Sequence, residues 1–156
     1  MANAQYELLR GLEEADVDRV LALGSRISLS GGDELFPLGA HADYLYLVSH
    51  GQISLTLPMK VREQETDVQV EERTAWQTVG WSALIPPHRF TLRATATVGT
   101  EVVALSRDSL EKYFTTHPEV GYKVSLNLAA VIGQRLQLFQ AMWLREVARM
   151  VEHRAA

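Results

Sequence analysis

The sequence predicts a mainly β domain, a double-stranded β-helix (jelly-roll β-roll) flanked by helices and followed by one long C-terminal helix. Short apolar runs between residues 26 and 105 are separated by glycines at the spacing typical of a β-sandwich or barrel. After residue 116 the apolar residues recur every three or four positions, which is the period of a helix. The 156 residues, 47% of them hydrophobic and 22% charged, indicate a single globular domain.

Composition and charge exclude several classes of function. The chain has no cysteine, which excludes disulfides, thiolate metal sites and a cysteine nucleophile, and agrees with the cytoplasmic location that we expect. A net charge of −4 disfavours direct DNA binding, which usually needs clustered basic residues. The N-terminus lacks the pattern of a signal peptide, and no uncharged stretch is long enough to span a membrane.

The elements are predicted in order along the chain. Residues 1–25 hold N-terminal helices, because an amphipathic apolar set is interrupted near Gly11 and stopped by Gly24. Residues 26–105 form about eight strands, and residues 75–79 are strand-like. Residues 60–73 are mixed in charge and poor in large apolar side chains, so we interpret them as a solvated hairpin arm or mobile loop without a function.

Two helices are predicted after the strands. Ser106 can cap a short helix over residues 106–115, and the run Thr116-His117-Pro118-Glu119 can start a helix that continues to about residue 154. This last helix carries two apolar stripes. One stripe is expected to cover the β-roll and contains Val124, Leu128, Val131, Leu138 and Met142. The other contains Ile132, Leu136, Phe139, Trp143, Val147 and Met150.

Because two stripes imply two partners, the second stripe predicts a homodimer about a two-fold axis, with Phe139 and Trp143 near its centre. We expect the interface at Ile132, Leu136, Phe139, Trp143 and Met150. The alternative is a helix that folds back on its own domain.

Residues 79–98 are the candidate site, because glycine, prolines, basic residues and aromatics interrupt the strand pattern only there. Gly80 opens a short segment that Pro86 and Pro87 must end, and period-two alternation resumes at Leu92. Backbone N–H groups near Gly80 and the guanidinium of Arg89 could face an anion in such a cradle. Arg93 has the parity of a residue that points away from the core.

This stretch resembles the phosphate-binding cassette of the cyclic-nucleotide-binding domain family, the sensor of catabolite-activator-type regulators. The family pattern is Gly-Glu-x-(Ala/Ser)-Leu followed by Arg-(Ser/Thr)-Ala-x-Val-x-Ala, and Gly80, Leu84, Ala94 and Ala96 fit it. A second family pattern is matched upstream at Gly32, Leu35, Phe36, Gly39, Leu45, Tyr46, Val48, Gly51, Ile53 and Leu55. The resemblance implies a β-roll, a ligand-sensing function and a dimerisation helix.

The cassette departs from the family at two positions. The ribose-binding glutamate falls on Trp81 and the phosphate-binding arginine on Phe90, while Arg89 is one residue out of register. We therefore expect cyclic AMP to bind feebly or not at all. An effector, if one binds, is expected to be small and planar or nucleotide-like, with Trp81 stacked on it or filling its place. The candidate ligand-binding residues are Gly80, Trp81, Ser82, Ala83, Arg89, Phe90 and Gln140.

Three functions follow from this sequence. The first is a dimeric, non-catalytic sensing module that acts through an unknown partner protein, since the chain ends before the helix-turn-helix that the family's activators carry. The second is a structural or interaction protein whose pocket Trp81 and Phe90 fill. The third is a cupin-like enzyme, but the five histidines lack the i, i+2 or i, i+4 spacing of metal ligands. We expect no catalytic residues, no metal and no cofactor.

Overall fold

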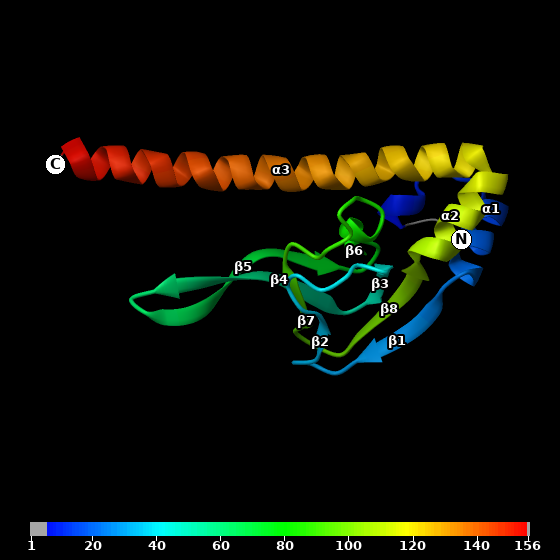
Figure 1. The fold of residues 1–156 in the computed structure, drawn as a ribbon, viewed down its shortest axis with the longest axis horizontal. Coiled ribbons are helices and arrows are strands. Elements are labelled where there is room, and N and C mark those ends of the chain that lie inside the picture. Colours follow the sequence, from blue (N-terminus) through cyan, green and yellow to red (C-terminus); the bar gives the residue numbers. More distant parts are fainter. Residues whose placement is uncertain (1–5, 156) are drawn as a thin grey trace.

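A computed structural model, which describes residues 6–155, has the predicted jelly-roll architecture (Figure 1). Eight strands form two four-stranded antiparallel sheets, in the orders β1-β8-β3-β6 and β2-β7-β4-β5. The strands are β1 (Ser25–Leu29), β2 (Glu34–Phe36), β3 (Tyr44–His50), β4 (Gln52–Val61), β5 (Gln64–Thr74), β6 (Thr78–Val79), β7 (Arg93–Ala96) and β8 (Thr100–Ser106). The fold class predicted from the sequence is confirmed.

One continuous apolar core holds the two sheets and the flanking helices together. Strand β3 is buried along most of its length, because it pairs with β8 and β6 in the middle of its sheet. In β7 the alternation is strict, with Ala94 and Ala96 buried and Arg93 half-buried on the opposite face. Arg93 pairs there with Glu34 and Asp67, as its parity predicted.

The N-terminal helices flank the β-roll. A short 3-10 helix, η2 (Glu7–Leu9), is followed by α1 (Glu14–Ala22), and Gly11 separates them in a left-handed conformation at φ +83°. Gly24 ends this segment against β8, where an added Cβ would lie 2.6 Å from Val103 Cγ1. The chain can therefore pass this point only with glycine.

The two C-terminal helices are α2 (Arg107–Thr116) and α3 (Pro118–Ala155). Ser106 caps α2 as predicted, because its Oγ accepts a hydrogen bond of 3.1 Å from the Ser109 N–H. The first half of α3 packs on the domain, while its second half extends past the core on the same side as the β4–β5 hairpin (Figure 1). No helix within residues 6–155 is long and apolar enough to cross a membrane.

The structure differs from two expectations, one for the β4–β5 hairpin and one for the residues that follow it. Its tip is the predicted solvated arm, but its base is not, because Arg73 is only 4% exposed. The strand predicted over residues 75–79 is shorter and contains only Thr78 and Val79. The preceding residues turn instead: the Gln77 side chain accepts the Thr74 N–H at 2.8 Å, and Trp76 adopts φ +74°.

Candidate functional site

The cassette begins with a sharp turn at Gly80. This residue has φ +82° and leads from β6 into the 3-10 helix η3 (Trp81–Ala83). An added Cβ at Gly80 would lie 3.1 Å from Phe90 Cε1, so glycine provides both the conformation and the space. The first N–H groups of such a turn have no partner within the helix, which leaves them available to an acceptor.

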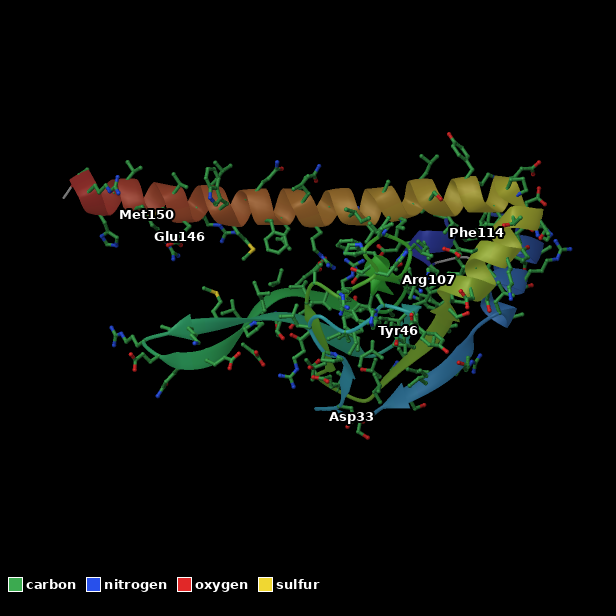
Figure 2. The ribbon with its side chains drawn as sticks, in the orientation of Figure 1. Asp33, Tyr46, Arg107, Phe114, Glu146 and Met150 are labelled. Carbon is green, nitrogen blue, oxygen red and sulfur yellow. The ribbon has the colours of Figure 1, made fainter. Side chains whose placement is uncertain are left out.

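Arg107 fixes the back of this turn. Its Nη1 donates to the carbonyl oxygens of Ala42, at 2.8 Å, and Ala83, at 3.3 Å, and its Nη2 pairs with Asp43 at 3.3 Å. Arg107 is the first residue of α2 and lies next to η3 (Figure 2). The turn is thus tied to α2 and to the segment just before β3 in the absence of a ligand.

The cavity beneath η3 has a volume of only about 10 Å³, which is room for about one water molecule. It is lined by Phe36, Leu55, Gly80, Trp81, Ser82, Phe90, Thr91, Leu92 and Arg135. Four of the predicted site residues therefore meet here: Gly80, Trp81, Ser82 and Phe90. Ala83 is fully buried behind them and does not line the cavity.

Aromatic rings occupy the space below the cassette. The Phe90 ring is 5% exposed and stacks on Phe36, with centroids 3.6 Å apart and planes 11° from parallel. Phe36 in turn stacks on Tyr46, with ring centroids 6.0 Å apart. Tyr46 lies on β3 (Figure 2). Burial raises the pKa of the Tyr46 hydroxyl, and nearby Tyr44 and Asp43 raise it further. These rings fill the space beneath η3 apart from the cavity of about 10 Å³.

Arg89 and Gln140 lie away from the cavity. Arg89 is exposed, and its Nη1 donates to the Gly39 carbonyl at 2.9 Å, while its backbone forms a bridge with His41. Arg89 points away because successive residues of an extended chain face opposite ways, and here Phe90 points inward. Gln140 is exposed on α3. Neither residue lines the cavity, and their part in ligand binding stays a prediction.

The sequence reading missed Arg135, the one cationic side chain that lines the cavity within the described residues. It comes from α3, is 8% exposed, and donates through Nε to Glu71 Oε2 at 2.8 Å. Burial lowers the pKa of this guanidinium, and the Glu71 carboxylate opposes the shift. A signal was present: Arg135 follows Val131 by four residues on the buried stripe, and a buried arginine is expected to be paired.

Arg135 is one end of a buried chain of four charged side chains. Glu71 Oε1 accepts from Arg73 Nη1 at 2.8 Å, and Arg73 Nη2 pairs with Glu7 Oε1. Glu7 also accepts the Thr78 N–H at 2.8 Å, and Arg73 Nε donates to the Thr78 carbonyl at 3.1 Å. These four side chains connect the N-terminal segment, β5 and α3 with β6, the strand that leads into the cassette. Glu7, Glu71, Arg73 and Arg135 thus form a buried ion network.

The histidines do not come together. Among residues 6–155 there is no group of three or more histidine, aspartate or glutamate side chains that could hold a metal ion. His88 is the histidine closest to the cassette turn in sequence, and its Nδ1 lies 3.2 Å from the Ser82 carbonyl.

Several solved structures share this fold. A putative cyclic nucleotide-binding protein from Geobacter metallireducens is 22% identical, with a TM-score of 0.67 over 84% of this chain and 92% of that chain. The catabolite activator protein of Thermus thermophilus is 25% identical, with a TM-score of 0.73 over 91% of this chain and 63% of that chain. The c-di-GMP responsive global regulator CLP from Xanthomonas campestris is 18% identical, with a TM-score of 0.76 over 85% of this chain and 64% of that chain.

This chain thus spans less than two thirds of the length of those last two regulators. No curated protein sequence matches it. The family model described as "Cyclic nucleotide-binding domain" matches residues 26–117, which is more than half of the chain and covers the whole β-roll and α2. This match, with the jelly roll and the cassette turn at Gly80, shows that the chain belongs to the cyclic nucleotide-binding domain family.

Proposed function

We propose that this domain is a non-catalytic regulatory module whose cassette is filled by its own aromatic side chains and binds cyclic AMP feebly or not at all. The observation that carries the proposal is the Phe36–Phe90 stack, with its centroid distance of 3.6 Å and the remaining volume of about 10 Å³. A nucleotide could enter only if the Phe90 ring left its buried position.

The charges of the cassette support the same conclusion. Trp81 and Phe90 stand where the family pattern has a carboxylate and a guanidinium. A hydrogen bond to a charged group contributes about 1.5–3 kcal/mol. Two such losses weaken binding by about two to four powers of ten, so that a micromolar dissociation constant becomes roughly millimolar.

Arg135 limits the negative charge that an effector can carry. Its guanidinium lines the cavity beside Gly80, Trp81 and Ser82, but Glu71 already neutralises it. An anionic ligand would therefore compete with Glu71 for one guanidinium. We infer that an effector carries at most one negative charge and a flat, apolar body that Trp81 can cover.

We further propose that the domain acts as a homodimer through α3. Four of the five predicted interface residues are more than a third exposed there, namely Leu136, Phe139, Trp143 and Met150, whereas Ile132 is half-buried. A contiguous apolar surface of this kind usually marks an interaction site. Because the net charge is −4, we expect the output to pass to a partner protein rather than to DNA directly.

A second candidate function is a structural or interaction protein with a permanently filled pocket. The tight aromatic stack favours it, since a well-packed interior resists opening. The two candidate functions predict different effects of a larger cavity on ligand binding.

Thermal shift tests the proposal. At about 1 mM, a ligand with a micromolar dissociation constant stabilises the folded state by about 4 kcal/mol, which raises Tm by about 8–16 °C. We expect no significant rise with cyclic AMP or cyclic GMP. A rise with indole-3-acetate, a planar aromatic monoanion, would support the sensing module, while its absence would favour the filled, structural pocket.

A variant with an opened pocket provides a second test of the proposed function. Phe90→Ala should lower the free energy of unfolding by about 3–5 kcal/mol, because it removes a buried ring and leaves a cavity. If the proposal is right, Phe90→Ala responds to indole-3-acetate more strongly than the wild type. Equal responses of the two proteins would show that Phe90 does not block the pocket.

A further inference from the structure

A larger cleft lies beside α1, away from the cassette. Its volume is about 230 Å³, space for roughly eight water molecules and hence for a small metabolite. The cleft is lined by Tyr6, Leu21, Gly24, Arg26, Ser49, Trp76, Glu101 and Val103. None of these residues lines the cassette cavity.

Two opposite charges stand side by side at this cleft. Arg26 Nη1 and Glu101 Oε1 are 4.0 Å apart, at the limit of an ion pair, and they belong to the paired strands β1 and β8. The Arg26 side chain is 82% exposed, and within the described residues Glu101 is its one ionic partner. Glu101 Oε1 also accepts the Ser49 hydroxyl at 3.3 Å. Both charged groups therefore keep hydrogen-bonding capacity for a ligand.

Aromatic rings form the apolar part of the cleft. Tyr6 and Trp76 meet edge to face, with centroids 5.1 Å apart and planes at 72°, and Leu21 and Val103 lie beside them. Burial raises the pKa of the Tyr6 hydroxyl, so this group stays neutral and can donate a hydrogen bond. An apolar side chain of a ligand would be covered here.

The backbone of Trp76 is strained. Its φ of +74° is rare for a bulky residue, and such strain persists only where the surroundings enforce it, often at ligand sites. The Trp76 N–H donates to the Val48 carbonyl at 2.8 Å, and the Trp76 carbonyl accepts the Glu7 N–H at 2.9 Å. These two bonds fix the ring at the cleft. The strain and the paired charges are independent observations at one place.

We propose that this cleft binds a free amino acid with an apolar side chain. Its carboxylate would meet Arg26, its ammonium group Glu101, and its side chain Trp76 and Leu21. A simple anion would face the Glu101 carboxylate and a simple cation the Arg26 guanidinium, so the zwitterion matches the charge pattern best. This inference does not depend on the function proposed for the cassette.

Trp76 can report binding directly. The chain has three tryptophans, so the variant W81F/W143F retains Trp76 alone. Its emission is titrated with L-leucine and with two analogues that each lack one charge, 4-methylpentanoate and isoamylamine. We expect a saturable change with L-leucine at a dissociation constant of about 1 mM or tighter, and binding at least about tenfold weaker for each analogue.

Charge variants in the same background complete the test. Arg26→Gln and Glu101→Gln should each weaken L-leucine at least about tenfold. The matched control is Arg93→Gln, because Arg93 is also a partly exposed arginine paired with carboxylates, but in the other sheet. Arg93→Gln should leave the dissociation constant for L-leucine unchanged. Absence of a saturable response up to about 10 mM L-leucine, or an equal response to 4-methylpentanoate, would overturn the proposal. Cyclic nucleotide titrations report on the cassette separately.

Discussion

At the scale of single residues, charge pairing inside the protein decides what the cassette can do. Arg73 and Arg135 are nearly fully buried, and Glu7 and Glu71 balance them. A paired buried charge adds little to stability, but an unpaired one costs several kcal/mol. Each member of the buried ion network therefore holds the others, and Arg135 is kept at the cavity.

Breaking this network should destabilise the fold strongly. Arg135→Met removes one of the two arginines that pair with Glu71 and leaves Arg73 in place, so we expect the free energy of unfolding to fall by about 1.5–3 kcal/mol. Urea denaturation measures this loss. The control is Arg93→Met at a more exposed pair, where the change should stay within about 1 kcal/mol. Similar losses in both variants would show that burial of the network contributes nothing special.

The buried tyrosines predict a loss of stability in alkali. Burial raises the pKa of Tyr46 and Tyr6 in the folded state, whereas an unfolded tyrosine titrates near its ordinary pKa of about 10. The neutral phenols favour the folded state, so the stability they support is complete below pH 10. It is lost as pH rises above 10 through the folded-state pKa. Tyr46→Phe should flatten this decline in urea titrations between about pH 9 and 11. An unchanged slope would contradict the assignment to Tyr46.

At the scale of elements, α3 has two different apolar faces. Val120, Val124, Leu128 and Val131 are buried on the domain, whereas Leu136, Trp143, Leu144 and Val151 are mostly exposed. The exposed face continues along the half of the helix that extends past the core, where Glu146 and Met150 lie (Figure 2). A helix of 38 residues with such a face is expected to pair with a second one.

Charges on the exposed face should therefore prevent assembly. We expect the double variant Phe139→Glu with Trp143→Glu to be monomeric by light scattering, because burying two carboxylates in the pair is unfavourable. A double variant on the side of α3 opposite Trp143, Gln134→Glu with Ala141→Glu, adds the same charge at exposed positions and should remain dimeric. A dimer that survives the first double variant would place the interface elsewhere.

At the scale of the whole molecule, the sequence predicted the parts that depend on local chemistry. Gly39 and Gly51 turn the chain at positive φ, so their spacing reveals the strands of the roll, and the apolar period reveals α3. Ser106 was recognised as a cap because the signal lies within four residues.

The remaining features depend on contacts between residues far apart in the sequence, which a local sequence pattern does not reveal. Glu71 and Arg135 are 64 residues apart, and only the folded chain brings β5 to α3. The hydrogen bond from Arg89 to the Gly39 carbonyl was equally hidden, because it joins residues 50 apart. The filled cavity needed Phe36 and Phe90 to stack across two sequence motifs that each look ordinary alone.

The central claim is that this cyclic-nucleotide-type pocket is closed by Phe90 and lacks the charges for cyclic AMP. Isothermal titration of the wild-type protein with cyclic AMP and cyclic GMP tests it most directly. We expect a dissociation constant of roughly a millimolar or weaker for both nucleotides. A value of about a micromolar or tighter would contradict it, and would mean that Phe90 moves aside and that Arg135 or Arg89 supplies the phosphate contact.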